Sequence, residues 1–336
     1  MVTNPPPLDF PLQIAEQVAM ITMPQRLTVI EAVPFKAFVS ELLRGHPLPQ
    51  QIKLDLGETQ FLDSSGVGAL VQVLKLTQGH QIPLILCRAN PPVLAVLGMT
   101  GLDKIFTLES LSPGLTPSQI TGVSAAPDVL PPRTHPSIRS PLKRAVDIIG
   151  SLVGLAITGV LAIPIAIAIK LDSPGPILFA QTRLGWLGKP FKILKFRSMC
   201  TDAEALKSQI KNEVEGAIFK NKNDPRITKV GKFLRKTSLD ELPQFWNVLK
   251  GEMSLVGTRP PTPDEVEQYE VPAWQRLDVK PGMTGEWQVN GRSSITKFED
   301  IIKLDLRYQE NWSHLYDLKL ILKTIFILFN KKSGAA

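Results

Sequence analysis

The stretch Gly231–Pro260 reads GKFLRKTSLDELPQFWNVLKGEMSLVGTRP and sets two adjacent acids, Asp240 and Glu241, among basic residues. Pro243 lacks a backbone N–H and fits only the first turn of a helix, so a helix is predicted to begin near residues 238–240. A helix start favours negative charge, so Asp240 is expected to stay ionised and to attract anions to its surroundings. An ionised aspartate can be a nucleophile or hold a divalent metal, and arginines can grip phosphate oxygens as planar forks. The neighbouring cations are Lys232, Arg235, Lys236 and Arg259.

The same residues also allow a purely structural interpretation. Ser238-Leu239-Asp240-Glu241 matches the S-x-x-E capping box, in which Glu241 only closes the helix start. With Ser238 as the cap, however, Pro243 falls about one position too deep in the helix. From these residues alone, capping and catalysis remain equally open.

Four motifs, in order along the chain, resemble those of the bacterial sugar transferases, the monotopic polyprenyl-phosphate phosphoglycosyl transferases. The motifs are KFRSM at 195–199, KTSLDELPQ at 236–244, LVGTRP at 255–260 and KPGMTGEWQVNGR at 280–292. The resemblance runs from about residue 141 to the C-terminus. Thr258 departs from the family pattern, which usually reads Pro-Arg-Pro at this point.

The resemblance implies transfer of a sugar-1-phosphate from a UDP-sugar to polyprenyl (undecaprenyl) phosphate, which initiates exopolysaccharide synthesis. It implies that Asp240 attacks the β-phosphorus and carries a covalent phosphosugar, with Glu241 as the second catalytic residue. Mg²⁺ bound by Asp240 is expected to offset charge repulsion during the attack. The expected substrate-binding residues are Lys195, Arg197, Arg235 and Arg259.

Residues 1–110 are predicted to form a small α/β domain, because short β-rich runs alternate with helical patterns. The predicted strands are Arg26–Ile30, Ile52–Leu56, Ile82–Cys87 and Ile105–Leu108, and the predicted helices are Pro34–Arg44, Ser65–Gln78 and Pro92–Leu97. Within this domain, the run FLDSSGVGAL at 61–70 resembles the STAS domain of anti-sigma-factor antagonists. The resemblance implies that Ser65 is a regulatory phosphosite and that a regulatory protein binds this domain. Alternatively, Asp63, Ser64 or Ser65 simply caps a helix.

Charge and composition divide the rest of the chain. Residues 1–110 hold 7 Lys and Arg against 9 Asp and Glu, and residues 141–336 hold 29 against 21, so the excess of +7 belongs to the second half. This half is expected to meet anionic lipids of the inner leaflet and phosphorylated substrates, whereas no nucleic-acid-binding motif is present. Residues 111–140, rich in Pro and Ser, are predicted to be a flexible linker. The two cysteines fit a reducing cytosol, and the four histidines show no zinc-ligand spacing.

Residues 141–171 are predicted to be a re-entrant membrane helix. They include 22 consecutive uncharged residues between Asp147 and Lys170, apolar on all sides and interrupted by Pro164. In the resembling family the break falls about one turn earlier. Basic residues on both flanks predict that both ends lie in the cytosol, which makes the protein monotopic on the cytoplasmic face of the bacterial inner membrane. Residues 172–336 would then form a mainly helical α+β catalytic domain, with its last apolar helices packed at the membrane interface.

Two other classes of function remain open. One is a membrane-tethered STAS regulatory protein whose transferase half is inactive. The other is a lipid-phosphate hydrolase with similar anchoring, which would need no acceptor. The sugar, the polyprenol and the presence of a homo-oligomer are left undetermined by the sequence.

Overall fold

The computed structural model describes residues 10–109, 134–210, 212, 221, 223–291, 295 and 297–329. The chain divides into two compact units. Unit 1 comprises residues up to Thr134 together with two later segments, Leu187–Lys189 and Tyr269–Asp278. Unit 2 comprises the remainder from His135 onward. The predicted linker lies mostly outside the described residues, but its C-terminal part forms a short 3-10 helix, η2 (Pro136–Arg139), in unit 2.

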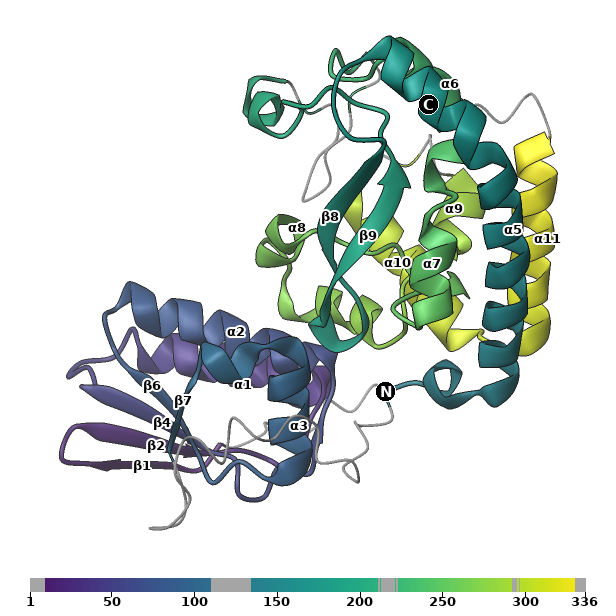
Figure 1. The fold of residues 1–336 in the computed structure, drawn as a ribbon. Helices are drawn as coiled ribbons and strands as arrows, with labels where there is room; N and C mark the ends of the chain where they lie inside the picture. Colours follow the sequence, from purple (N-terminus) through teal and green to yellow (C-terminus); the bar gives the residue numbers. More distant parts are fainter. Residues whose placement is uncertain are drawn as a thin grey trace. The chain divides into compact units, whose positions relative to one another are not determined.

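Unit 1 is built on a five-stranded sheet with the order β1-β2-β4-β6-β7. A hairpin of β1 and β2 is antiparallel, and the remaining neighbours are parallel. Helices α1 (Val29–Leu42) and α2 (Ser64–Gly79) lie side by side and cover one face of the sheet (Figure 1). The strands are β1 (Leu12–Ala15), β2 (Val18–Thr22), β4 (Gln51–Asp55), β6 (Leu84–Cys87) and β7 (Thr107–Glu109), with β3 (Arg26–Leu27) pairing β5 (Phe61–Leu62) apart from them.

The α/β architecture predicted for this domain is therefore confirmed, with corrections at its beginning. Val29 and Ile30 open α1 rather than end a strand, because Thr28 and Glu31 form a capping box at this helix start. The hairpin of β1 and β2 was not predicted from the sequence. After β6, helix α3 (Pro91–Thr100) ends at Gly101, whose φ of +76° is the left-handed conformation that glycine adopts most readily.

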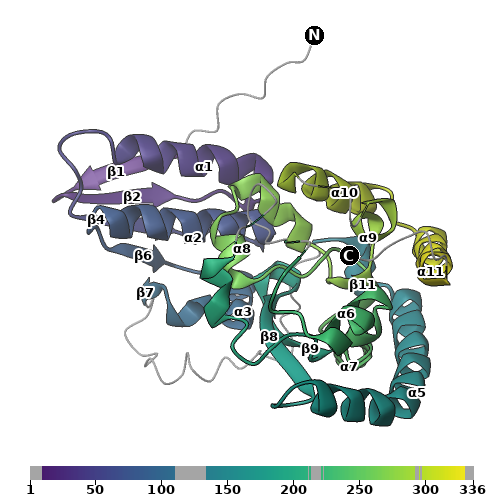
Figure 2. The ribbon, with the colours of Figure 1, turned by 90° about the horizontal axis from the view of Figure 1, so that it is seen from above.

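In unit 2, η2 is followed by α5 (Pro141–Asp172), a 32-residue helix whose first turn is capped by Ser140. Of the described helices, α5 is the one long and apolar enough to cross a membrane by length and composition. It continues through Pro164, and its path changes direction toward its C-terminal end (Figures 1 and 2). A proline inside a helix removes one hydrogen bond and crowds the preceding turn, which accounts for such a bend. The bent helix has the form expected of a re-entrant membrane element.

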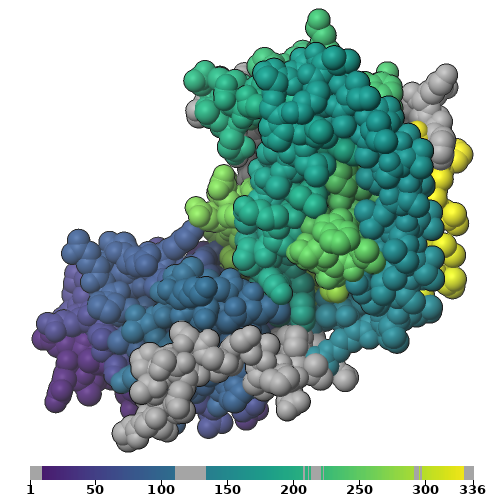
Figure 3. All heavy atoms as spheres, in the orientation of Figure 1, coloured from purple at the N-terminus to yellow at the C-terminus, as the bar shows by residue number. Residues whose placement is uncertain are grey.

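Only a narrow stripe of α5 packs against the rest of unit 2. Its buried residues recur at three- and four-residue spacing, whereas Val160 and Leu171 are 76% and 83% exposed. Gly154 allows close approach, because a Cβ at this position would meet the ring of Phe245 at 2.4 Å. In the space-filling view, α5 forms one side of unit 2, with the yellow spheres of the last helix beside it (Figure 3). The exposed apolar surface is what a helix immersed in lipid requires.

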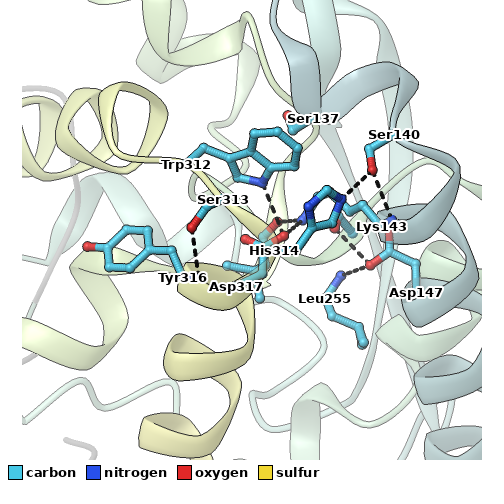
Figure 4. A network of polar contacts seen from close by, with 12 residues as sticks. Ser137, Ser140, Lys143, Asp147, Leu255, Trp312, Ser313, His314, Tyr316 and Asp317 are labelled. Atoms are coloured by element: carbon cyan, nitrogen blue, oxygen red, sulfur yellow. Dashed lines mark hydrogen bonds and ion pairs between the residues drawn. The ribbon is translucent and has the colours of Figure 1, made fainter.

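The first turns of α5 are fixed by a buried polar network (Figure 4). Lys143 Nζ lies 2.6 Å from Asp317 Oδ2, and both side chains are less than 10% exposed. Tyr308 donates a hydrogen bond of 2.8 Å to Asp317 Oδ1, and Asp147 accepts hydrogen bonds from Ser254 and Leu255. A buried ion pair is tolerated where its remaining polar atoms are also paired, as they are here.

The rest of unit 2 is a mixture of helices and short sheets, as predicted. A hairpin of β8 (Leu178–Leu184) and β9 (Pro190–Phe196) is followed by α6 (Lys229–Lys236), α7 (Gln244–Lys250) and the parallel pair β10 (Ser254–Val256) and β11 (Gly282–Thr284). The remaining helices are α8 (Pro263–Glu267), α9 (Glu286–Gly291), α10 (Phe298–Glu310) and α11 (His314–Phe329). The segment from Thr201 forms turns and a short 3-10 helix, Ala205–Gln209.

Candidate active site

The acidic pair lies in a tight turn between α6 and α7. Asp240 and Glu241 belong to a single 3-10 turn, Leu239–Glu241, and α7 begins only at Gln244, after Pro243. The backbone of Ser238 has a φ of +55°, a left-handed conformation that is uncommon for residues other than glycine. Such conformations concentrate at functional sites, where the surrounding structure holds them in place. Asp240 is 5% exposed at this turn.

The capping-box interpretation of this turn is wrong. Ser238 makes no side-chain capping hydrogen bond, because its left-handed backbone does not have the extended geometry of a helix cap. Glu241 instead meets Lys195 of β9, whose Nζ lies 3.1 Å from Glu241 Oε1. Both side chains remain partly exposed, at 27% for Lys195 and 22% for Glu241. The structure therefore brings together two of the predicted site residues that lie 46 positions apart in the sequence.

Arg235, in the last turn of α6, is held beside this pair. Its Nε donates a 3.0 Å hydrogen bond to Ser198 Oγ, which belongs to the KFRSM motif. Burial lowers the pKa of the Arg235 guanidinium, while the negative charges of Asp240, Asp224 and Glu241 act to raise it. An arginine stays charged even with a lowered pKa, so this site keeps a fixed cation close to the acidic pair.

The guanidinium groups of Arg259 and Arg197 are both engaged by protein atoms. Arg259 makes a two-pronged ion pair with Glu265, at 2.8 and 3.0 Å, and lies 5.9 Å from the ring centre of Trp287. Burial acts to raise the pKa of Glu265, but the charge and hydrogen bonds of Arg259, together with the charge of Arg183 and the backbone N–H of Thr262, outweigh it and the pKa is lowered. Arg197 donates to the backbone oxygens of Ser173 and Pro174 at 2.6 and 2.8 Å. Arg197 thus clamps the turn that follows α5.

A second buried ion pair adjoins the site and was not predicted from the sequence. Asp224 and Arg226 are each 5% exposed, and the Arg226 guanidinium donates hydrogen bonds to both carboxylate oxygens of Asp224, the shortest of 2.7 Å. The negative charge of Asp224 acts on Arg235, and the backbone N–H of Cys200, just after the KFRSM motif, donates to the Arg226 oxygen at 2.9 Å. The pattern of an acid and an arginine on either side of Pro225, just before the basic helix α6, could have indicated this ion pair in the sequence.

Asp240 and Glu241 are the candidate donors for a magnesium ion. Among the described residues, no group of three or more His, Cys, Asp or Glu side chains could hold a metal ion. Mg²⁺ usually binds enzymes through one or two carboxylates, with substrate phosphates and water completing its octahedron. Asp240 with Glu241 provides this smaller donor set, so the residues fit a metal that arrives with a diphosphate and not a permanently caged ion.

The predicted phosphosite, Ser65, lies in unit 1 at the second residue of α2. The side chain is fully buried, and its Oγ has no hydrogen-bond partner among the residues described. Asp63 is the helix cap and accepts a 2.9 Å hydrogen bond from the Gly66 N–H. The capping function is therefore confirmed for Asp63. Phosphorylation of Ser65 stays a prediction, and it would require the helix start to become exposed.

Two family models match separate parts of the chain. Residues 138–331 match the family model of bacterial sugar transferases, and residues 9–113 match the model of the STAS domain. The first match covers more than half of the chain. The chain belongs to the bacterial sugar transferase family and carries an N-terminal STAS domain.

Three curated relatives illustrate the similarity. The galactosyl transferase CpsE of Streptococcus agalactiae is 52% identical over 188 residues, which are 55% of this chain and 42% of CpsE. The UDP-glucose:undecaprenyl-phosphate glucose-1-phosphate transferase of Escherichia coli is 41% identical over 241 residues, 69% of this chain and 49% of that protein. The exopolysaccharide production protein ExoY of Rhizobium meliloti is 38% identical over 189 residues, 54% of this chain and 83% of ExoY. The chain thus spans less than half of the first two proteins and most of the third.

Proposed function

We propose that this protein transfers a sugar-1-phosphate from a UDP-sugar to polyprenyl phosphate at the cytoplasmic face of the membrane. The observation that carries the proposal is the buried Asp240, which lies beside the fixed cation Arg235 and the Lys195–Glu241 pair. This arrangement suits a carboxylate nucleophile that must approach a negatively charged diphosphate. The names of the E. coli and R. meliloti relatives support the substrate class and a role in exopolysaccharide synthesis.

The reaction has two displacement steps at phosphorus. In the first, an oxygen of Asp240 attacks the β-phosphorus of the UDP-sugar, the bond to the bridging oxygen breaks, and UMP leaves with the electron pair. In the second, a phosphate oxygen of the polyprenyl phosphate attacks the same phosphorus and releases the Asp240 carboxylate. The product is a polyprenyl-diphosphate sugar. A covalent relay lets a water-soluble donor and a lipid acceptor use one site in turn.

The neighbouring residues have separate tasks in this scheme. Arg235 provides positive charge for the phosphate oxygens, and Lys195 holds the Glu241 carboxylate beside Asp240. Glu241 can accept or return a proton at one of its carboxylate oxygens. Mg²⁺, held by Asp240 and the substrate diphosphate, would supply neutralising charge at the phosphoryl oxygens.

Location at the membrane follows from α5 in this proposal. Its exposed apolar surface and its bend at Pro164 suit a helix that enters and leaves the same leaflet. Anionic lipids of the inner leaflet would then meet the basic residues that flank the helix.

The experiment that tests the function measures UMP release by the purified protein with UDP-glucose or UDP-galactose, with and without undecaprenyl phosphate. We expect at most one equivalent of UMP per enzyme without the lipid phosphate and repeated turnover with it, with the sugar label moving into the lipid product. Asp240→Asn should abolish both, whereas Asp300→Asn, a matched change in an exposed ion pair on α10, should leave them unchanged. A folded protein without transfer would favour the inactive regulatory protein, and sugar phosphate released without an acceptor would favour a hydrolase.

A further inference from the structure

One segment of the transferase sequence folds as part of unit 1. Residues Tyr269–Asp278, here called the strap, lie between α8 and β11 in the chain but belong to the compact unit of the STAS domain. Most of the strap is a 3-10 helix, Val271–Leu277. Tyr269, Trp274 and Arg276 are at most 5% exposed, and Arg276 donates a 2.6 Å hydrogen bond to the Tyr269 hydroxyl. The strap is therefore an ordered, buried part of this domain.

The strap covers the small side chains at the start of α2. Ser64, Ser65 and Val67 are at most 1% exposed. A helix on a sheet ordinarily buries one face, whereas this helix start is buried all round and needs a second cover. The ring of Trp274 in the strap provides this cover at Gly68, where an added Cβ would lie 2.5 Å from it. The absence of a side chain at residue 68 leaves room for the indole.

Polar contacts fix the strap at both of its ends. Asp278 Oδ1 accepts a 2.9 Å hydrogen bond from the backbone N–H of Ser64, so the strap supplies a second cap to a helix start that Asp63 already caps. At the other end, Gln72 of α2 donates to the Tyr269 oxygen, and Lys36 of α1 lies 2.5 Å from Glu270. These contacts join residues about two hundred positions apart, from 197 for Gln72 to 234 for Lys36.

We propose that the strap is the binding partner of this STAS domain, which holds a segment of its own chain on the α1–α2 surface. The α1–α2 surface fits the strap in two ways. Gly68 leaves room for the indole of Trp274, and the Ser64 N–H donates to Asp278. A separate regulatory protein that uses the same surface must therefore displace the strap. The two strap ends connect directly to α8, where Glu265 holds Arg259, and to β11, so strap release would be transmitted along the backbone to the transferase half.

Hydrogen exchange of the full-length protein tests this proposal independently of the proposed reaction. Amide protection of a peptide covering the strap is followed by mass spectrometry in the wild type, in Gly68→Ala and in Gly79→Ala. Gly79 lies at the end of the same helix, and a Cβ there would meet nothing within 4 Å. Both changes replace a helical glycine with the better helix former alanine, so any loss of protection in the strap reports the contact with Trp274.

We expect Gly68→Ala to reduce strap protection about tenfold or more, while β4 and β6 stay protected and Gly79→Ala behaves as wild type. Trp274→Ala, which leaves residues 10–109 unchanged, should reduce protection of the α2 start to a similar extent. Protection should not change on tenfold dilution, because the contact is intramolecular. Unchanged protection in both variants, or loss of protection on dilution, would overturn the proposal.

Discussion

Lys195 and Glu241 form an ion pair of 3.1 Å between strand β9 and the turn that carries Asp240. The pair orients the second carboxylate of the site and keeps both partners partly in contact with solvent. Glu241 is therefore positioned from outside its own turn, which explains how a short 3-10 segment can present two adjacent acids in different environments.

Glu241→Gln should lower turnover by about 10²-fold, because the amide keeps the size of the side chain but removes its charge and its capacity to bind a proton. Lys195→Met should have a smaller effect on turnover, because Glu241 stays in place but loses its orienting cation. Steady-state UMP release by the two variants measures both effects. The assigned functions would be contradicted if the lysine change were as severe as Asp240→Asn and the glutamate change were silent.

The buried pair next to the site predicts an effect on stability. Asp224→Asn leaves Arg226 charged and buried without its carboxylate partner, and should lower the free energy of unfolding of unit 2 by about 3–5 kcal/mol. Asp300→Asn removes an exposed ion pair and should cost less than about 1 kcal/mol. Thermal unfolding in detergent, with both variants measured in parallel, checks the difference. Equal unfolding temperatures for the two variants would show that the Asp224–Arg226 pair contributes no more than a surface pair.

Binding of the strap should depend on pH. Burial, followed by the charge of Asp63, raises the pKa of Asp278 to about 7, and burial raises the pKa of Asp63 to about 6, with Glu31 of α1 adding to the effect. Both carboxyl groups bind protons more readily when the strap is bound than when it is released. Strap binding is therefore strongest at low pH and weakens as the pH rises through about 7.

Hydrogen exchange again provides the measurement, with each rate divided by the intrinsic rate at the same pH. Strap protection should fall about tenfold or more between about pH 5.5 and about pH 8. In Asp278→Asn the amide oxygen can still accept from Ser64, so protection at about pH 8 should rise and the pH dependence should flatten. A variant that remained as pH-dependent as the wild type would assign the titration to other groups.

The bent membrane helix predicts that both of its flanks face the cytosol. Single cysteines at Arg139 and Lys189, in a protein whose Cys87 and Cys200 have been replaced, should react with a membrane-impermeant maleimide only after cells are lysed. A cysteine at a residue known to face the periplasm in an unrelated membrane protein serves as the positive control. Labelling of either position in intact cells would establish a helix that spans the membrane.

The sequence was sufficient to predict elements that depend on local patterns. The apolar run of α5, the helix at 64–79 and the paired C-terminal helices are each visible as composition or period, and the structure confirms them. The hairpin of β1 and β2 was missed because all four residues of β1 are exposed and its turn, Glu16–Gln17, contains no glycine. A strand without a buried face gives no alternating pattern.

Features that depend on distant contacts could not be read from the sequence. The left-handed backbone of Ser238 prevents it from capping a helix, although the residue types match the capping-box pattern. Arg259 and Arg197 were recognised as important cations, but their engagement by Glu265 and by the turn after α5 depends on tertiary packing. The strap is the clearest example, since no local pattern indicates that Asp278 caps a helix that begins 214 residues earlier.

Mass spectrometry of the protein shows whether Asp240 becomes covalently attached to the phosphosugar. The wild type is mixed with a UDP-sugar in the absence of polyprenyl phosphate, quenched in acid and digested. We predict a mass increase equal to one phosphosugar on the peptide that contains Asp240, loss of the adduct when undecaprenyl phosphate is added before quenching, and no adduct in Asp240→Asn. Transfer by the wild type without an adduct, or an adduct that persists in Asp240→Asn, would show that Asp240 is not the nucleophile.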